Sequence, residues 1–491
     1  MKHNKIFWLI VILTSCLGGV YNVGYYHPDE HWQILEFAGY WWGRVPEISL
    51  PWEYHHQMRP ALQPMLAYIV GLFSEWIYGE YNPFFWTLFL RFLSALFSIF
   101  SVYQLSKVLE NEIDDPKLKN YLWLFSYFSW FLLFLHVRFS SEGWSASAWI
   151  LGVAYILKSP KENHSFFIAG IWLGLAFVFR YQLGFAILGV ILWLILLKNE
   201  NKFFKLFALS LGGLSVIILS TILDSVFYGR FVIAPYNYFY ENLILKKVST
   251  FGKEPWYFYL AILLKSQTFL FNLVYLICSL YFIVKYPKHL ITWTVIPFVL
   301  IHLIIKHKED RFLFPLLNFV PFWFIKTLDM EKLNIFEKYK YNFLKIWFII
   351  QIPFSLKVVY SYLQPQLIMY ELAWKYDKEP VILYFREYPR EVECEWSKKQ
   401  DHQNQCLKHN VYLKSNIKIW YYCPGDRIAL DTSKYSVALI EFYDFREKKN
   451  IPQSFKRVYS YYPEWVIKYL NFGGWVQRTS FLEIYEYRGK N

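Results

Sequence analysis

The sequence is poor in cysteine and in charged residues for its length. Only 5 of its 491 residues are Cys, and 18% are Asp, Glu, Lys or Arg. The cysteines form neither a CxxC pair nor the spacing of a zinc site, which argues against a metal or dithiol site built from them. Cys16 and Cys278 lie in apolar runs and are interpreted as packing residues. The sequence also lacks an internal repeat, which counts against a transporter built from two symmetric halves.

Hydrophobic residues are abundant instead, at 56% of the chain, and the mean hydropathy is +0.21. Apolar runs near 20 residues are long enough to cross the ~30 Å hydrocarbon core of a bilayer, and they recur through the first three quarters of the chain. These runs predict a polytopic α-helical membrane protein. The aromatic content of 22% suits residues at the membrane interfaces. About eleven spans are expected, at 6–24, 84–108, 120–137, 142–157, 165–179, 183–197, 205–223, 257–284, 290–305, 312–327 and 343–361.

Loop charge predicts the orientation of these spans. The run 61–78 is short, and we interpret it as a re-entrant or interface-lying helix. The N-terminus and five loops then share one side, and each carries at least two Lys. The positive-inside rule places that side in the cytoplasm. The net charge of +13 is thereby explained without nucleic-acid binding. The glycosylation sequon Asn163-His164-Ser165 falls on the cytoplasmic side and should be silent.

Two parts of the chain are expected. Residues 1–361 form the transmembrane module, in which 25–83 is the first external loop and carries interface helices. The first run, 6–24, is interpreted as an uncleaved span. Residues 362–491 contain no span and predict a non-cytoplasmic α+β domain, because 381–385 and 437–440 are typical of buried strands. This domain holds Cys394, Cys406 and Cys423, which allow one disulfide and leave one thiol.

The segment from His27 to Glu36 follows the first span and is rich in polar residues. Pro28 suits the first position of a helix, and Asp29 and Glu30 then occupy its first turn. Asp29 and Glu30 could simply cap this helix. Alternatively, Asp29 is a general base that takes a proton from an acceptor hydroxyl at the outer membrane surface.

A cationic segment lies far along the chain, directly before the span at 312–327. Its sequence is Lys306-His307-Lys308-Glu309-Asp310-Arg311. Cations at a helix N-terminus can bind phosphate, although an interface anchor that snorkels is the alternative. We favour the phosphate site, because these cations break the loop-charge trend.

Further candidates are weaker. The external stretch 224–259 combines aromatic residues with Asp224, Asn237 and Trp256, as a site for a sugar or a lipid headgroup would, but also as any interface loop does. Other candidates are Arg59 with Gln63 in the first external loop, Arg180 with Gln182 in a short external turn, and Arg91 within a span, which could equally be structural.

Together these segments resemble the polyprenol-phosphate-mannose-dependent α-mannosyltransferases of glycosyltransferase family 22, and most closely the GPI mannosyltransferase III members. Three patterns carry the resemblance, in order, between residue 25 and about residue 320. They are His27-Pro28-Asp29-Glu30 with Gln33 and Glu36; Asp224 to Gly229 with Pro235, Asn237 and Pro255-Trp256-Tyr257; and His307-Lys308-Glu309 with Arg311-Phe312 and Pro315.

The resemblance implies a GT-C fold and an inverting transfer of mannose that needs neither metal nor cofactor. The donor would be a polyprenyl-phosphate-mannose, and the acceptor a glycan or glycolipid at the non-cytoplasmic face. Asp29 would be the base, and Glu30 a second acidic residue that orients a substrate. His307, Lys308 and Arg311 would hold the departing phosphate, and the substrate-binding residues would be His27, Gln33, Arg59, Arg180, Gln182, Asp224, Asn237 and Trp256.

Membrane lipids are the remaining expected partners. The family suggests the ER membrane with a lumenal site, and a bacterial inner membrane with a periplasmic site is the physical equivalent. A GT-C enzyme that moves arabinose or glucose would have the same scaffold. A lipid or sugar transporter is the alternative from another class, although the polar residues cluster on one face.

Overall fold

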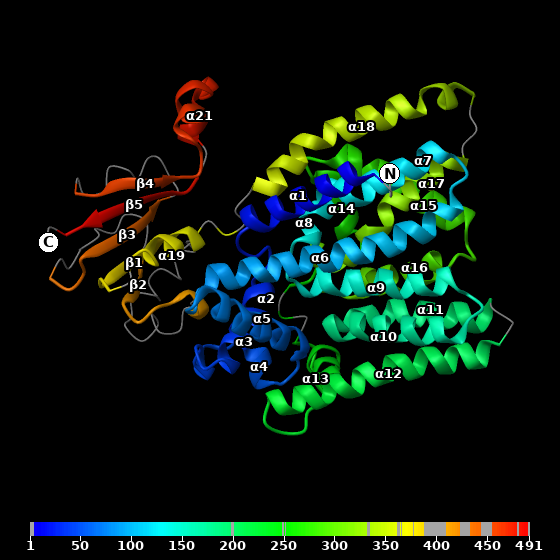
Figure 1. The fold of residues 1–491 in the computed structure, drawn as a ribbon, viewed down its shortest axis with the longest axis horizontal. Helices are drawn as coiled ribbons and strands as arrows, with labels where there is room; N and C mark the ends of the chain where they lie inside the picture. Colours follow the sequence, from blue (N-terminus) through cyan, green and yellow to red (C-terminus); the bar gives the residue numbers. More distant parts are fainter. Residues whose placement is uncertain are drawn as a thin grey trace. The chain divides into compact units, whose positions relative to one another are not determined.

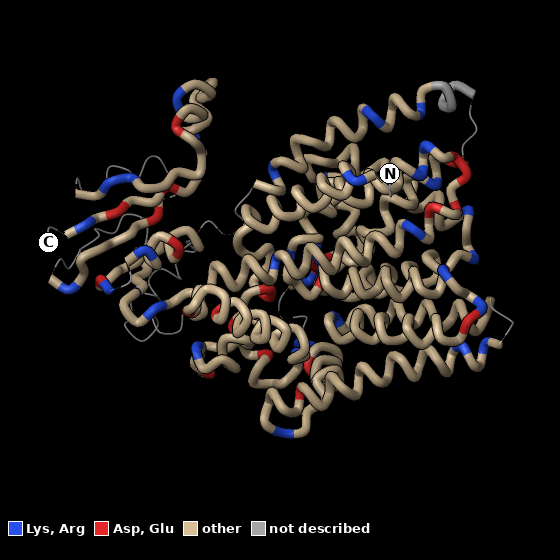
Figure 2. Tube along the Cα trace, viewed as in Figure 1, with Lys and Arg blue, Asp and Glu red and all other residues tan. Residues whose placement is uncertain are grey.

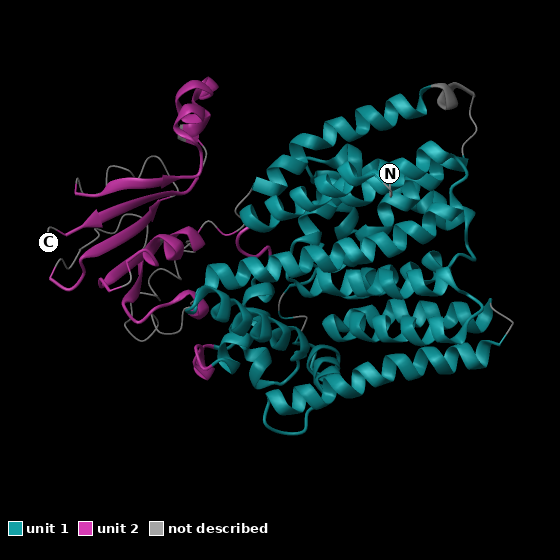
Figure 3. Ribbon diagram, viewed as in Figure 1, with its two compact units in different colours: residues 1–22, 27–42, 50–361 teal, residues 23–26, 43–49, 362–491 magenta. Residues whose placement is uncertain are grey.

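The computed structural model describes residues 4–197, 201–247, 250, 252–330, 334–360, 364, 366–376, 378–386, 409–422, 433–442, 454–478 and 481–489. Cys394, Cys406 and Cys423, and with them the expected disulfide, lie outside these residues. The chain divides into two compact units (Figure 3). Unit 1 comprises Met1–Asn22, His27–Trp42 and Leu50–Ser361, and unit 2 comprises Val23–Tyr26, Gly43–Ser49 and Tyr362–Asn491.

Unit 1 is helical, and its long helices lie side by side (Figure 1). The α-helices are α1 (Lys5–Tyr21), α2 (Pro28–Glu30), α3 (Glu36–Trp41), α4 (Trp52–His55), α5 (Leu62–Tyr78), α6 (Pro83–Leu109), α7 (Pro116–Phe128), α8 (Trp130–His136), α9 (Ser141–Lys158), α10 (Asn163–Phe179), α11 (Gly184–Leu196), α12 (Lys202–Phe227), α13 (Ala234–Phe239), α14 (Phe258–Lys265), α15 (Phe269–Lys285), α16 (Leu290–Ile304), α17 (Val320–Met330) and α18 (Asn334–Tyr360). Short 3-10 or π segments are η1 (His31–Leu35), η3 (Glu110–Glu112), η4 (Tyr181–Leu183), η5 (Tyr240–Ile244) and η7 (Asp310–Phe319).

Each expected span coincides with helical structure, but two of them are broken. The run 120–137 is interrupted at Ser129, whose backbone is extended. The run 257–284 is interrupted between α14 and α15, where Ser266 and Thr268 hydrogen-bond the side chain of Asn272. Hydroxyl and amide side chains compete with the helical backbone for hydrogen bonds, which explains why apolar content alone does not reveal such breaks.

Several helices are long and apolar enough to cross a membrane. Four helices in the described part of the chain could cross by these criteria: Pro83–Glu112, Lys202–Phe227, Asp310–Met330 and Tyr339–Tyr360. The pair Phe269–Lys285 and Leu290–Ile304, bent by 120°, raises this to five if it counts as one span. Shorter apolar helices are Lys5–Tyr21, Asn163–Phe179 and Tyr181–Leu196. The total of about eleven spans, and the interface position of α5, stay predictions.

Small residues let neighbouring helices approach closely. A Cβ built on Gly212 of α12 would lie 2.2 Å from the backbone oxygen of Phe167, and one on Gly170 of α10 would lie 2.2 Å from that of Leu209. Close backbone contact at small residues is typical of helix packing in membranes, where the lipid leaves no hydrophobic drive for association.

The loops that carry the predicted cytoplasmic Lys residues meet at one end of the helices. Backbone N–H groups of Asp114 and Asp115 donate to the Asp329 carboxylate at 3.0 and 3.1 Å. His289 contacts Glu112 at 3.2 Å, which brings the α15–α16 loop to the same place. Figure 2 shows Lys and Arg gathered at this end, and Figure 1 shows α2, α3, α4 and α5 at the other end of α6.

Unit 2 contains a mixed five-stranded sheet, and the expected α+β character is present. Its strands are β1 (Val381–Arg386), β2 (Ile417–Tyr422), β3 (Val437–Phe442), β4 (Lys456–Ser460) and β5 (Glu483–Arg488), in the order β2-β1-β3-β5-β4. β1 pairs in parallel with β2 and β3, and β5 pairs antiparallel with β3 and β4. Among its described residues, the helices of this unit are α19 (Leu367–Ala373), α21 (Glu464–Tyr469), η8 (Asn410–Tyr412) and η10 (Phe472–Arg478), with η2 (Glu47–Ser49) from the N-terminal half of the chain. β3 is buried along its whole length.

Candidate active site

Two segments far apart in the sequence meet in unit 1. Nη2 of Arg311 donates to Oδ2 of Asp29 at 2.7 Å. Asp29 lies in the first turn of α2, where Pro28 takes the first helical positions as predicted and His27 is the N-cap. Nδ1 of His27 accepts the backbone N–H of Asp29 at 3.2 Å. The polar segment after the first span and the late cationic segment therefore share one site.

Arg311 is surrounded by carboxylates. Besides Asp29, its guanidinium donates to Glu142 at 2.9 Å and makes a close contact with Glu309. The Arg311 side chain is only 5% exposed. A buried guanidinium requires such partners, because an unpaired charge would be costly to desolvate. Arg311 thus joins α2, the start of α9 and the segment before η7.

Glu142 is the second centre of this network. The same oxygen, Oε1, accepts from Arg311 and, at 2.6 Å, from Nη1 of Arg180. Its side chain is 3% exposed. Glu142 lies in the first turn of α9, where the helix dipole favours a negative charge.

The carboxylate of Asp29 remains partly accessible, at 26% exposure. Burial alone would raise the pKa of Asp29, but the nearby charges of Arg311 and Arg59 and the contact with His27 outweigh it and hold that pKa well below 3.8. Similarly, the pKa of Glu309 is lowered to about 2, because contacts with His307 and Arg311 outweigh the effect of burial. Both carboxylates are therefore ionised at neutral pH.

Glu30 forms a separate and more deeply buried ion pair with Arg138. Nε of Arg138 donates to both Glu30 oxygens, at 3.0 and 3.3 Å, and Nη2 of Arg138 makes a further short contact. Nη1 of Arg138 donates to Oδ1 of Asn22 at 3.1 Å. This pair ties α2 to the chain that follows α8. The substrate-orienting role expected for Glu30 is untested, and these contacts favour a structural one.

Other residues of the first external loop form hydrogen bonds and ion pairs with one another near Asp29. His31 and Glu36 are fully buried and hydrogen-bond each other at 2.8 Å. Gln33 donates to Glu53 at 3.0 Å. The Arg59 guanidinium lies 3.5 Å from Glu53 and 3.8 Å from Asp29.

His307 and Lys308 of the late segment also have partners. His307 contacts Glu309 at 2.9 Å. Lys308 is buried, and its ammonium donates to the backbone oxygen of Glu254 at 3.2 Å and contacts that of Ile305. The phosphate-binding role of His307, Lys308 and Arg311 stays a prediction.

The external stretch after α12 packs partly against the first external loop. Oδ1 of Asp224 accepts the backbone N–H of Ala61 at 2.7 Å, and Asn237 donates to the backbone oxygen of Gln57 at 3.1 Å. Gln182 donates to the hydroxyl of Tyr238 at 2.7 Å. Trp256, by contrast, is 69% exposed and contacts Tyr257. Arg91 donates to the backbone oxygen of Gly19 at 2.6 Å, away from this network.

Sequence reasoning missed two of the charged residues that organise the site. Arg138 and Glu142 lie in a short polar turn between apolar runs, and each is a single charge next to a span. Charges at membrane depth are functional candidates by default, so this position was the available signal. Among the described residues, no group of three or more His, Cys, Asp or Glu side chains could hold a metal ion.

The fold defines the class of protein. The chain superposes on ArnT from Cupriavidus metallidurans, a membrane glycosyltransferase of the GT-C fold, in its apo state with a TM-score of 0.54. The identity is 10%, and the match covers 98% of this chain and 97% of ArnT. The structure of the same protein bound to undecaprenyl phosphate gives a TM-score of 0.52 at 9% identity. At such low identity these matches establish the fold alone.

The sequence then defines the family. Residues 5–382 match the Alg9-like mannosyltransferase family, and the chain belongs to it. The resemblance to glycosyltransferase family 22 is thereby confirmed. Mannosyltransferase APTG1 of Arabidopsis thaliana is 27% identical over 305 residues, which cover 60% of this chain and 53% of the relative. GPI alpha-1,2-mannosyltransferase 3 of Homo sapiens is 25% identical over 306 residues, which cover 60% and 52%. The chain thus spans about half the length of these relatives.

Proposed function

We propose that this protein is an inverting mannosyltransferase, which moves mannose from a polyprenyl-phosphate-mannose donor to a hydroxyl of a glycan or glycolipid acceptor. The reaction takes place at the non-cytoplasmic membrane face, and the membrane is that of the ER by analogy with the GPI relatives. The contact between Asp29 and Arg311 carries the proposal, because it brings together the first and the last of the three sequence patterns.

Asp29 acts as the general base. The acceptor oxygen attacks the anomeric carbon, the bond from that carbon to the phosphate oxygen breaks, and the phosphate leaves with the electron pair. The hydroxyl proton passes to Asp29. The acceptor oxygen becomes strongly acidic once it bonds to carbon, so a carboxylate with a lowered pKa is sufficient.

Arg311 is a positioning residue in this scheme. Its three carboxylate contacts fix the guanidinium, and the guanidinium in turn fixes one oxygen of Asp29. The phosphate is already a good leaving group, so a general acid is not required, and positive charge near the phosphate supplies the remaining stabilisation.

Replacement of Asp29 tests the proposal. Membranes that contain the full chain are incubated with polyprenyl-phosphate-mannose and a GPI-type acceptor, and transfer is measured. Asp29→Asn should lower the rate by about a hundred- to ten-thousand-fold, since the general base is lost. The matched control is Glu80→Gln, an exposed carboxylate in the same external loop.

If the wild-type protein transfers glucose or arabinose but not mannose, the proposed donor sugar is wrong and the transferred sugar takes its place in the proposal. Full activity of a correctly inserted Asp29→Asn protein would remove Asp29 from the role of base.

A further inference from the structure

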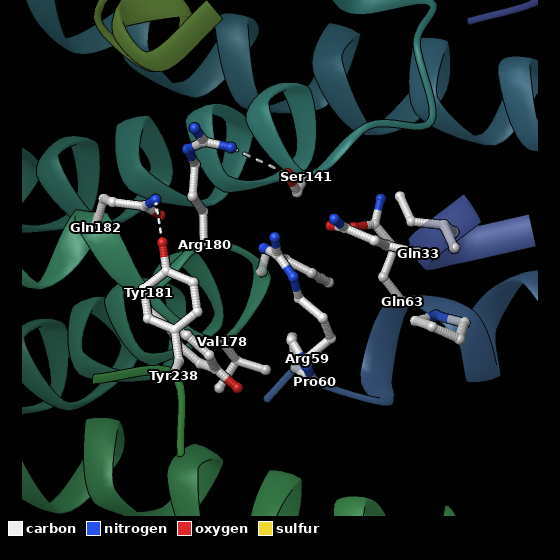
Figure 4. Close-up of a pocket in the computed structure, with 13 residues that line it drawn as sticks. Gln33, Arg59, Pro60, Gln63, Ser141, Val178, Arg180, Tyr181, Gln182 and Tyr238 are labelled. Carbon is white, nitrogen blue, oxygen red and sulfur yellow. Dashed lines mark hydrogen bonds between the residues drawn. The ribbon is translucent and has the colours of Figure 1, made fainter. Parts of the chain in front are cut away.

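A cavity lies between the first external loop, the α10–η4 turn and the stretch after α12, and Arg59 of its lining lies 3.8 Å from Asp29. Polar side chains from these three segments line it (Figure 4): Gln33, Arg59, Gln63, Arg180, Tyr181 and Tyr238. All of these residues belong to unit 1. None of them comes from the late cationic segment.

The lining holds several buried polar atoms without a hydrogen-bond partner in the described structure. They are Nε of Arg59, Nε2 of Gln63, Nε of Arg180 and the hydroxyl of Tyr181. The side chain of Arg180 is 7% exposed and Gln63 is 3% exposed. Leaving a buried polar group without a hydrogen-bond partner destabilises a protein. Four of these atoms belong to residues that line one cavity, which is where a ligand would be able to supply the missing partners.

Arg59 is held by longer contacts than the other arginines near Asp29, and its guanidinium lies 5.5 Å from the centre of the Tyr238 ring. Arg138, Arg180 and Arg311 each donate hydrogen bonds to a carboxylate. The Arg59 guanidinium donates none within the described residues, and its nearest carboxylate oxygens are 3.5 and 3.8 Å away. Its backbone, by contrast, is held in place, because Tyr228 donates to the Arg59 carbonyl at 2.9 Å and Asp224 binds the N–H of Ala61.

The chemistry of the unpartnered atoms distinguishes an anion from a sugar. All four can donate a hydrogen bond, and among them only the Tyr181 hydroxyl can also accept. A sugar ring presents hydroxyls that need donors and acceptors in similar number, whereas a phosphate presents acceptor oxygens and a negative charge. Guanidinium groups match phosphate oxygens in both charge and geometry.

We propose that this cavity binds a phosphate group, with Arg59 as its principal contact and Gln63, Arg180 and Tyr181 completing the site. The inference rests on the proposed function and assigns a part of it, since it places the phosphate contact on Arg59 instead of the late cationic segment. The phosphate has two possible sources: the polyprenyl carrier of the donor, or a phosphodiester of the acceptor lipid.

Ligand binding by the purified full chain in nanodiscs tests the inference. The probes are polyprenyl phosphate, the matching polyprenol without phosphate, and phosphatidylinositol. Arg59→Gln should weaken phosphate-dependent binding by about tenfold or more, because a charge-assisted hydrogen bond is lost. Arg230→Gln is the matched control, since it removes an exposed Arg from the same external side.

Tyr181→Phe serves as a second variant that does not depend on Arg59. Its hydroxyl has no hydrogen-bond partner among the described residues, so its removal should not lower the melting temperature. The substitution should nevertheless weaken phosphate binding several-fold, because the bound phosphate loses one hydrogen bond.

The probes separate the two sources. Weaker binding of polyprenyl phosphate alone identifies the donor carrier, and weaker binding of phosphatidylinositol alone identifies the acceptor. Unchanged binding of both by Arg59→Gln and Tyr181→Phe would overturn the inference, even if the wild type transfers mannose. Arg59-dependent phosphate binding by a protein that transfers no sugar would leave the cavity assignment standing and defeat the proposed function instead.

Discussion

At the scale of single residues, the charge of Arg311 keeps the candidate base Asp29 ionised. Arg311 contributes positive charge to Asp29 while it is itself neutralised by Glu142 and Glu309. Because these contacts are direct and poorly exposed, solvent screens them less than it would at a surface. Asp29 therefore stays ionised over the physiological range.

The lowered pKa predicts the pH dependence of transfer. Asp29, with its pKa well below 3.8, and Glu309, with a pKa of about 2, become protonated only in strong acid. Activity that depends on their charge is complete above these values and is lost only as the pH falls through them. The initial rate should therefore change by less than about twofold between pH 7 and pH 5. An acid limb with an apparent pKa near 6 would indicate a different base.

The sequence singled out Asp29 and Arg311 because both stand in unusual polar segments. It did not show that Glu142 links Arg311 to Arg180, because this pairing depends on how α2, α9 and η7 come together. Isolated charges such as Arg138 give no local indication of their partner, which for Arg138 is 108 residues away.

At the scale of elements, the pair of Glu30 and Arg138 fixes α2 against the chain between α8 and α9. α2 continues without a break through η1 into α3, so the pair anchors the first turn of a longer helical segment. The buried pair and the N-cap at His27 therefore hold Asp29 in place.

This role predicts opposite outcomes for two adjacent carboxylates. Glu30→Gln should lower the stability of the detergent-solubilised protein by about 3 kcal/mol or more, because Arg138 loses its charged partner in a buried site. The transfer rate per folded molecule should change much less than in Asp29→Asn. Thermal unfolding and rates normalised to folded protein measure both effects. Normal stability with abolished transfer in Glu30→Gln would make Glu30 a substrate-contacting residue.

The helices themselves follow directly from apolar runs, whereas their interruptions do not. Ser129 and the Ser266–Thr268 segment interrupt two runs whose mean composition is apolar. Such breaks arise from local hydrogen bonding, which hydropathy does not measure.

At the scale of the whole chain, the residues around Asp29 and the Lys-bearing loops occupy opposite ends of the helices of unit 1 (Figures 1 and 2). This separation is what a one-sided active site in a membrane requires. The positive-inside rule then assigns the two ends to the two faces.

Glycosylation in ER microsomes tests this orientation. The native sequon at Asn163 should carry no glycan, because the predicted orientation puts it at the cytoplasmic end. Glu47→Asn creates a sequon with Ser49 beside Ile48, which is 92% exposed, and this variant should gain one glycan that a glycosidase removes. A glycan on the wild-type protein, and none on the variant, would reverse the assigned orientation.

Glu142 offers a single oxygen to two arginines, Arg180 beside the cavity and Arg311 beside Asp29. Because that oxygen accepts from both guanidinium groups, the cavity and the candidate base are joined through one carboxylate. Glu142→Gln should therefore disturb both places at once, which no other single substitution of this network is expected to do.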